Sequence, residues 1–307
     1  MKEKDIYLQK YYEDCKLRKR LNEKTLKAYK IDLTQFFNFT EGELINNKLI
    51  IDYVHFLNEK YTKYKTVKRK IASLKAFYKY LEFEEIIAVT PFNRIRTKIK
   101  EPKLLPKTIA TKDMLRILKC LYDDYKNAHS QYKKFLALRN IVIIELLFGT
   151  GIRISELCHL EKKDINLSDK SLTIFGKGSK ERILFLGNDA VIEVLKKFMN
   201  LHNEKTNYLF LNKYGQRLSE QAVRLLINDL EKRLSLSIHI TPHMFRHTFA
   251  TRLLEKDVDI RYIQKILGHS SISTTQIYTH VSCSKQKEIM TNKNPRNDYS
   301  SYIENFY

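Results

Sequence analysis

The chain has 307 residues, of which 43% are hydrophobic, and its 56 lysine and arginine residues exceed its 35 acidic residues to give a net charge of +21. No apolar run approaches the roughly 18 residues that span a bilayer, and the N-terminus lacks the apolar core of a signal peptide. The four cysteines are far apart without disulfide or zinc-binding spacing, so we expect a soluble cytoplasmic protein. The positive charge favours a polyanionic partner, nucleic acid first and an anionic membrane surface second.

Residues 1–100 are predicted to form a helical domain. Apolar residues recur every three or four positions in KTLKAYKIDLTQFFNF and in TVKRKIASLKAFYKYLEF. The second segment also carries four closely spaced cations, Lys65, Lys68, Arg69 and Lys75. A solvated helix face and a face that follows DNA phosphates explain these cations equally well in so basic a domain. A proline-containing cationic stretch without helical period follows, and within it we assign residues 101–112 to a linker.

Residues 113–281 are predicted to form a second domain that is mostly helical. Helical periodicity runs through ALRNIVIIELLF, stops at GTG and resumes at SELCHL. The runs SLTIF and RILFL, joined by GKGSKE, predict a β-hairpin with glycines in its turn. Later helices are expected to break at Gly215, Pro242 and Gly268. The prediction is therefore a two-domain, mainly α fold with a small β-hairpin or sheet, followed by a tail over residues 282–307.

The stretch TPHMFRHTFA crowds two histidines and an arginine onto the start of a helix, because Thr241 and Pro242 favour a helix beginning there. Histidines four apart can form a helical zinc site, but the glutamate of that motif is missing and Arg246 would repel a metal ion. His243 and Arg246 share a helix face near its positive end, which suits an anion such as phosphate. We assign His247 to a structural role.

Other candidate residues also occupy predicted breaks, where the backbone would hold them. Arg153 follows GTGI at a helix entrance, Lys177 lies in the hairpin turn, and His269 follows the glycine that ends a helix. Tyr278 comes nine residues later, in SISTTQIYTH. The whole set has no carboxylate pair, Gly-rich nucleotide loop or usual magnesium ligands, so we expect no metal, nucleotide or other cofactor. Such residues could bind a phosphodiester and attack it with a phenol.

Four segments, GTGIRISEL, GKGSKER, HMFRH and LGHSSISTTQIYTH, resemble in order and spacing the boxes of the tyrosine recombinases, also called phage-type integrases. The helical first domain is similar to the core-binding domain of that family. The resemblance implies a site-specific DNA recombinase that works through a 3′-phosphotyrosyl intermediate and a Holliday junction. It also implies the catalytic set, which is Arg153, Lys177, His243, Arg246, His269 and Tyr278.

Within that resemblance, the two arginines would bind the scissile phosphate in place of a metal, Tyr278 would be the nucleophile and Lys177 the general acid. The ordinary pKa of tyrosine is about 10, so the phenol needs a base, for which His243 is the nearest candidate while the choice of histidine stays open. Glu156, three residues after Arg153, would orient a neighbouring cation or simply be a first-turn helix carboxylate.

The resemblance also suggests partners and alternatives. The helical pattern starts within about twenty residues and leaves no room for an extra arm-binding domain, as in the compact Xer type that resolves chromosomes or plasmids. Transposon-borne enzymes for integration and excision are equally short. The expected partners are double-stranded DNA with inverted-repeat half-sites and a homotetramer or a paired recombinase, with no membrane. The alternatives are a type IB topoisomerase-like enzyme that nicks and reseals DNA, and a DNA-binding module without catalysis.

Two further features of the sequence are a turn residue, Asp257, and the apolar end of the C-terminal tail. Asp257 stands where the family usually has glycine in a turn, and aspartate tolerates a left-handed backbone. The tail ends in YSSYIENFY, which groups apolar residues at helical spacing and would otherwise be an ordinary frayed terminus. The family resemblance implies that the tail contacts a neighbouring protomer, or folds back without DNA, through Ile303 and Phe306.

Overall fold

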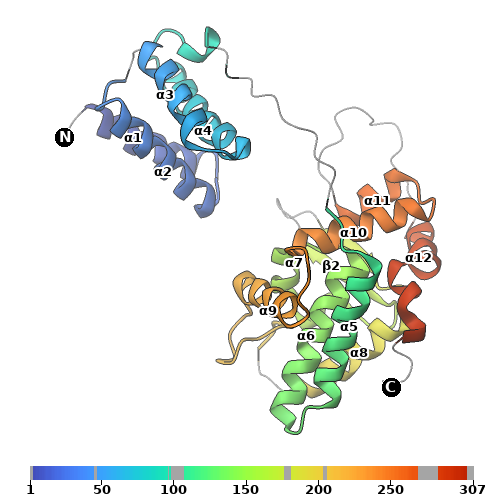
Figure 1. The fold of residues 1–307 in the computed structure, drawn as a ribbon. Coiled ribbons are helices and arrows are strands. Elements are labelled where there is room, and N and C mark those ends of the chain that lie inside the picture. The colour runs from blue at the N-terminus through green and yellow to red at the C-terminus, as the bar shows by residue number, and fades with distance from the viewer. Residues whose placement is uncertain are drawn as a thin grey trace. The chain divides into compact units, whose positions relative to one another are not determined.

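The computed structural model divides into two compact units, Met1–Leu104 and Leu105–Tyr307, which are described separately (Figure 1). The described residues are 3–44, 47–95, 97, 107–175, 181–202, 206–268 and 283–302. Helices dominate both units and the second also has a three-stranded sheet, so the predicted mainly α fold is confirmed. None of the helices in these ranges is both long and apolar enough to cross a membrane.

The first unit packs its helices around an aromatic core. Its elements are α1 (Glu3–Leu17), α2 (Glu23–Phe39), α3 (Asn47–Lys60), α4 (Tyr64–Phe83) and the 3-10 helix η1 (Pro91–Asn93). Asn22 starts α2 by accepting a hydrogen bond from the Thr25 amide at 2.9 Å. Phe36 and Phe77 are fully buried among other aromatic rings, several of them in edge-to-face contact.

A charged cluster also lies in this unit, beside the aromatic core. Asp32 on α2 is fully buried and accepts hydrogen bonds from Lys70 at 2.9 Å and from Ser73 at 2.8 Å, and it also pairs with Arg69. Lys70 is itself buried and donates a second bond to Gln35 at 2.6 Å. The cluster joins α2 to α4 because a buried carboxylate must keep its cationic partners.

The second unit holds the remaining elements. They are α5 (Thr111–Lys126), α6 (Gln131–Thr150), α7 (Ile154–His159), η2 (Lys162–Asp164), β1 (Ile165–Asn166), β2 (Ser171–Phe175), β3 (Glu181–Phe185), α8 (Asp189–Leu201), α9 (Glu220–Arg233), α10 (Pro242–Glu255), α11 (Ile260–Leu267), α12 (Cys283–Asn292) and η3 (Pro295–Tyr302). The strands form an antiparallel sheet in the order β1-β2-β3, with Ser171 opposite Phe185. The predicted hairpin strands are therefore present.

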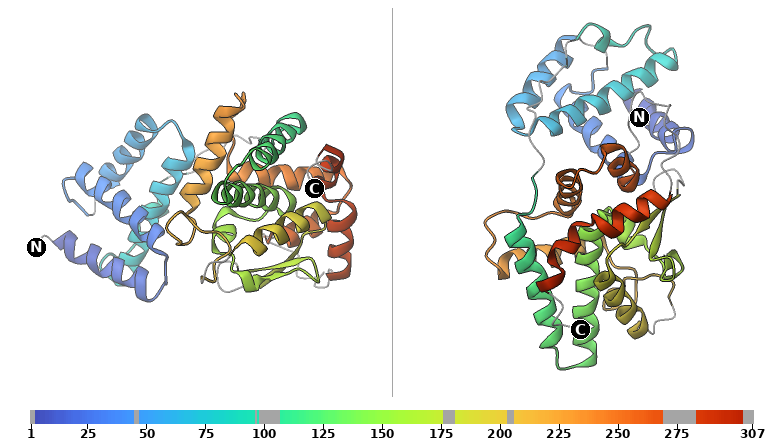
Figure 2. Two further views of the ribbon diagram at one scale, coloured as in Figure 1. Left: turned by 90° about the horizontal axis from the view of Figure 1, so that it is seen from below. Right: turned by 90° about the vertical axis from the view of Figure 1, so that its right-hand side faces the viewer.

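Helix α6 is the centre of the second unit, and α5 lies beside it in Figures 1 and 2. Residues 141–150 are all buried, as expected for a helix that is apolar on every side. The helix ends because Gly151 takes a left-handed conformation with φ of 63°. A Cβ at Gly151 would lie 2.7 Å from side-chain atoms of Leu267 and Phe249, so only glycine fits this approach.

Two segments belong more closely to the second unit than the sequence suggested. Ile109, in the predicted linker, is buried and its amide donates to the Thr248 hydroxyl at 2.8 Å, and α5 begins at Thr111. The second segment is the predicted tail that follows residue 281. Its residues 283–302 form α12 and η3, which lie against this unit in both views of Figure 2.

Residues 283–302 belong to the second unit because several of their apolar side chains are buried in its core. Ile289, Met290 and Tyr299 join the core of the second unit, and the Tyr299 ring meets Phe148 edge to face with centroids 5.4 Å apart. The expected contacts of Ile303 and Phe306 lie outside the described residues.

Asp257 supplies a stability prediction, because it has a φ of 56°, in the left-handed region. Asp257→Ala is expected to lower the free energy of unfolding by about 1 kcal/mol, since a Cβ without a polar group is disfavoured there. Asp257→Gly is the matched control and should stay within about 0.5 kcal/mol of the parent protein. Urea unfolding measures both, and an alanine variant as stable as the glycine variant would contradict the account.

Candidate active site

Arg153 and Arg246 are brought together by the backbone at the end of α11. Arg246, on α10, donates to the Gly151 carbonyl at 2.8 Å and to the Leu267 carbonyl at 2.7 Å. Arg153, at the start of α7, donates to the next carbonyl, Gly268, at 2.9 Å. Because Leu267 and Gly268 are consecutive, the two guanidinium groups are held next to each other.

The arginine pair concentrates positive charge in a partly buried position. Arg246 is 6% exposed, and burial together with the positive charge of Arg153 lowers its pKa to about 10. Arginine with that pKa still carries its charge at neutral pH. The Arg153 side chain is 34% exposed, so the pair can be reached from solvent. Two neighbouring like charges favour binding of an anion that both can contact.

Glu156 fulfils both roles that the sequence left open. It accepts a hydrogen bond from the Arg153 amide at 2.9 Å, as a first-turn helix carboxylate does, and another from the Arg153 Nη1 at 2.8 Å. Burial alone would raise the pKa of Glu156, but hydrogen bonds from Arg182 and from the Arg153 backbone outweigh it and leave the pKa below its usual value. The carboxylate is therefore ionised and orients Arg153.

Arg182 is a residue of this site for which the sequence gave no role. Its Nη1 and Nη2 donate to the two Glu156 oxygens at 2.8 and 2.7 Å, and its Nε donates to the Ile266 carbonyl at 3.3 Å. It thereby links β3 to the start of α7 and the end of α11. A Cβ at Gly268 would lie 2.9 Å from the Arg182 Cδ, which is why a glycine ends α11 beside this side chain. The sequence signal for Arg182 was its place in GKGSKER, where it follows the turn as the first residue of the predicted strand RILFL.

His243 lies in the first turn of α10, three residues before Arg246, and its side chain is exposed. It borders a hollow of about 460 Å³ whose lining also includes Lys107, His239 and His247. Burial, and then the neighbouring His243 and Arg246, lower the pKa of His247. The helix begins at Pro242 as predicted, although the Thr241 side chain makes no capping hydrogen bond. His247 faces this hollow instead of the core, unlike the structural role assigned to it.

The remaining predicted catalytic residues, Lys177, His269 and Tyr278, lie outside the described residues. The structure brings Arg153, Glu156 and Arg246 together, and His243 shares a helix with Arg246. Within the described ranges, no group of three or more His, Cys, Asp or Glu side chains could hold a metal ion.

The four predicted DNA-binding cations of the first unit lie on one exposed face of α4. Arg69 forms an ion pair with the buried Asp32, although the Arg69 side chain is 46% exposed. The Lys65 ammonium lies 5.9 Å from the Tyr64 ring centroid, and that of Lys75 lies 5.7 Å from the Phe92 centroid. The face is available to phosphates, but Arg69 carries a charge that Asp32 already balances in part.

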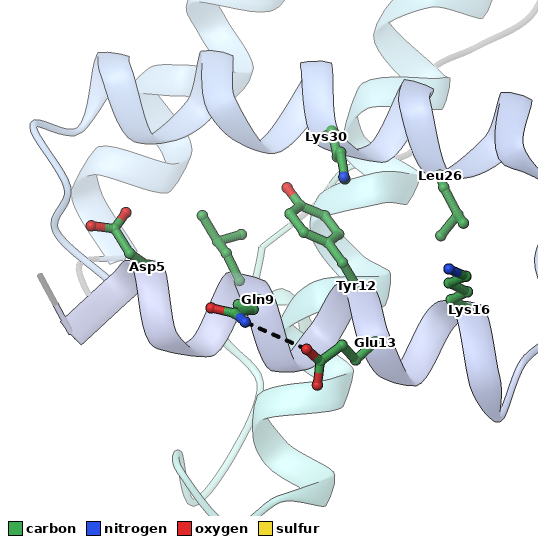
Figure 3. A pocket seen from close by; sticks show the side chains of 8 residues that line it. Asp5, Gln9, Tyr12, Glu13, Lys16, Leu26 and Lys30 are labelled. Atoms are coloured by element: carbon green, nitrogen blue, oxygen red, sulfur yellow. Dashed lines mark hydrogen bonds between the residues drawn. The ribbon is translucent and has the colours of Figure 1, made fainter. Parts of the chain in front are cut away.

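The first unit also has a hollow of about 400 Å³ between α1 and α2 (Figure 3). Its lining consists of Asp5, Leu8, Gln9, Tyr12, Glu13, Lys16, Leu26 and Lys30. Gln9 donates to Glu13 at 3.5 Å across one side of it. Apolar walls with charges of both signs do not favour a polyanion, so the arginine pair of the second unit is the stronger candidate site.

Comparison with known proteins decides the family. The model of the phage integrase family matches residues 110–285, and that of the phage integrase N-terminal SAM-like domain matches residues 8–85. The chain belongs to the phage integrase family. This confirms the resemblance seen in the four sequence boxes.

Named relatives of this integrase are similar over nearly their whole length. A tyrosine recombinase of Agathobacter rectalis is 51% identical over 299 residues, covering 95% of this chain and 97% of the relative. The tyrosine recombinase XerC of Thermodesulfovibrio yellowstonii is 36% identical over 302 residues, covering 94% and 96%. The predicted enzyme class, a tyrosine-type site-specific recombinase, is therefore confirmed.

Solved structures share the fold of this integrase. The XerH site-specific recombinase bound to a palindromic difH substrate is 20% identical with a TM-score of 0.68, covering 96% of this chain and 84% of that one. A lambda integrase dimer bound to a COC′ core site is also 20% identical, with a TM-score of 0.67, covering 91% and 99%. The two-domain, mainly helical architecture is thus a known one.

Glu156 gives a prediction with a defined pH range. Its pKa lies below the usual value of 4.5, so the stability it contributes is present above about pH 4.5 and is lost as the pH falls through the lowered pKa. Glu156→Gln should lower the free energy of unfolding at pH 7 by about 3 kcal/mol, because it leaves Arg182 without its carboxylate. The loss should shrink below pH 4.5.

Glu193→Gln is the matched control, since Glu193 pairs with Lys196 at 3.1 Å on the surface with half of its side chain exposed. That change should alter stability by less than about 0.5 kcal/mol. Urea unfolding from pH 3 to pH 7 measures both variants. Equal stability of Glu156→Gln and the parent protein at pH 7 would rule out the proposed ion-pair role.

Proposed function

We propose that this recombinase cleaves and rejoins double-stranded DNA through a 3′-phosphotyrosyl intermediate, with Arg153 and Arg246 on the scissile phosphate and Tyr278 as the nucleophile. The observation that carries this proposal is the pair of guanidinium groups on the consecutive carbonyls of Leu267 and Gly268. These carbonyls directly precede the segment that contains Tyr278 in the sequence. The active site thus combines a fixed anion-binding pair with a nearby nucleophile along the chain.

The reaction follows from the chemistry of these groups. The Tyr278 oxygen bonds to phosphorus, its proton passes to a base for which His243 is the candidate, and the 5′-oxygen leaves with a proton from Lys177. Arg153 and Arg246 donate hydrogen bonds to the nonbridging oxygens, where negative charge grows in the transition state. The phosphotyrosine keeps the bond energy, so rejoining to another strand needs no nucleotide. His269 completes the proposed site.

Glu156 supports this chemistry by directing Arg153. An arginine has five N–H donors, and the bonds to Glu156 and Gly268 occupy one on each Nη of Arg153. The donors left over are held in one orientation by these two bonds. Arg182 keeps Glu156 in place from the opposite side. The proposed result is an arginine whose free donors are already directed at the phosphate before DNA binds.

The partners follow from charge and from the relatives. The net charge of +21 and the cationic face of α4 favour duplex DNA that both units contact, the first as core-binding and the second as catalytic domain. The similar XerH and lambda integrase structures are complexes with a difH substrate and a COC′ core site. We infer that this chain acts in the cytoplasm on inverted-repeat half-sites as a homotetramer or with a paired recombinase. Chromosome or plasmid resolution and mobile-element integration or excision both fit.

The nucleophile provides the direct test. Tyr278→Phe removes only the attacking oxygen, so DNA affinity should be unchanged while the covalent adduct is lost by at least about 100-fold. Tyr262→Phe, in α11, is the matched control and should keep the adduct. The measurement is the SDS-resistant complex formed on a nicked suicide substrate in buffer with EDTA. Adduct from Tyr278→Phe, or a strict need of the parent protein for divalent ions, would refute the proposal.

The cationic face of α4 provides a second test. Lys65, Lys68 and Lys75 are changed together to glutamine, and Arg69 is kept because it holds Asp32. The slope of log affinity against log salt should become shallower by about 2 to 3, since each lost phosphate contact removes about 0.9. A matched triple change of exposed lysines, Lys196, Lys197 and Lys213, should leave the slope unchanged. The idea fails if both triple variants give the parental slope in gel-shift titrations.

A further inference from the structure

The segment after α12 binds the last turns of α6 through two fully buried polar side chains, Asn294 and Arg296. Asn294 donates from Nδ2 to the carbonyls of Gly149 and Leu186, both at 3.0 Å. Arg296 donates from Nε and Nη2 to the two Glu145 oxygens at 2.6 and 2.9 Å. These contacts join positions 108 to 151 residues apart in sequence, and the catalytic scheme above uses none of them.

The part of α6 that this segment contacts lies next to the backbone that binds Arg246. Glu145 and Gly149 lie one turn apart and therefore on one face of the helix. The last four carbonyls of a helix have no partner within it, and Asn294 satisfies one of them, that of Gly149. Two residues later comes Gly151, whose carbonyl accepts the Arg246 bond at 2.8 Å. Asn294 and Arg246 thus bind the same short turn from two sides.

Displacement of this turn would be transmitted to Arg246. Gly151 has no spare room, because even a Cβ there would come within 2.7 Å of Leu267 and Phe249. Leu267 also supplies the second carbonyl that Arg246 binds. A shift at Gly149 would therefore move one or both acceptors of the buried guanidinium. A closely packed interior passes such shifts on instead of absorbing them.

The ion pair between Arg296 and Glu145 stabilises the contact of this segment with α6. Glu145 is 1% exposed and the Arg296 side chain is fully buried, so neither charge can exchange its partner for water. Tyr122 adds a third hydrogen bond to Glu145 at 2.9 Å. Removal of one partner would leave an uncompensated buried charge, which is strongly unfavourable. The segment therefore has an electrostatic reason to stay on α6 that an apolar contact alone would not provide.

We propose that Asn294, secured by the Arg296–Glu145 pair, is a positioning residue for the recombination reaction: it fixes the turn of residues 149–151 and thereby sets Arg246 for the scissile phosphate. The inference rests on the proposed role of Arg246. Asn294 does not touch the phosphate in this scheme and acts only through the backbone of α6. Its loss should slow phosphate chemistry at saturating DNA without weakening DNA binding.

The test separates the arginine pair from the nucleophile. The first reaction is adduct formation by Tyr278 on a nicked suicide substrate at saturating DNA. The second is cleavage by hydrogen peroxide in a Tyr278→Phe background, where the hydroperoxide oxygen bonds to phosphorus and the 5′-oxygen leaves. The second reaction needs the arginines but not the tyrosine. DNA affinity is measured alongside by gel shift, and folding by thermal unfolding.

Asn294→Ala should slow both reactions by roughly 10- to 100-fold, since a misplacement of about 1 Å costs up to that much, with DNA affinity within about threefold of the parent. The matched control is Asn297→Ala. Asn297 lies in the same segment, but its side chain donates to the Thr291 carbonyl at 2.8 Å and accepts from Asn188 at 2.7 Å, and neither of these partners is on α6. It should leave both rates within about twofold, which excludes general loosening of the segment.

A second variant covers the case in which Asn294→Ala does not fold. Arg296→Lys keeps the positive charge near Glu145 but loses the paired donors, so it should slow both reactions in the same direction. Parental rates in both reactions would overturn the inference, as would slowing of the tyrosine reaction alone, which would mean that the segment acts on the nucleophile. Absence of any adduct from the parent protein would instead overturn the proposed function, and this inference with it.

Discussion

The catalytic unit depends on one constraint, which is that two positively charged guanidinium groups must be held side by side. The carbonyls of Leu267 and Gly268 meet this constraint by accepting one hydrogen bond from each arginine. Burial and the charge of Arg153 lower the pKa of Arg246 to about 10, because both disfavour its positive charge when no anion is bound. Glu156 offsets part of this charge, and a phosphodiester between the arginines would offset the rest.

The elements around the pair make sense as supports of that constraint. Gly151 lets α6 end close to α10 and α11, so that its carbonyl reaches Arg246. Gly268 leaves room for Arg182, which in turn fixes Glu156 against Arg153. The sheet, α7 and α11 therefore meet at one cluster of charged hydrogen bonds. Substitution of Gly151, Gly268 or Arg182 would act on the arginines indirectly, whereas Glu156 contacts Arg153 itself.

The sequence predicted the features that leave a local signal. Helix breaks at Gly151, Pro242 and Gly268 were readable because glycine can adopt a left-handed conformation and proline fixes φ, and the two arginines stood out beside those breaks. Lys177, His269 and Tyr278 stay predictions. Long-range partners left no such signal. Nothing near Arg182 or Arg296 in the sequence reveals the carboxylates with which these arginines pair.

The same reason explains the segment after residue 282, whose polar composition gave no signal of its burial within this unit. Asn294 and Arg296 are the polar residues that fasten it, so composition pointed away from burial. In the first unit, the Asp32 cluster likewise hides Lys70 in the core and leaves Arg69 half exposed. The partners of these cations on α2 could be found only from the folded chain.

Three of the acceptors that hold Arg153 and Arg246, the carbonyls of Gly151, Leu267 and Gly268, belong to the main chain, and this has a consequence for divergence. Every amino acid has the same carbonyl group, so substitution of Leu267 or its neighbours changes the packing without removing the acceptor. The orientation of the arginines therefore depends largely on the path of the backbone, together with the Glu156 carboxylate that binds Arg153. The surrounding side chains can be substituted as long as the backbone path is unchanged. A distant homologue can therefore retain the same pair of guanidinium groups in a largely different chemical setting.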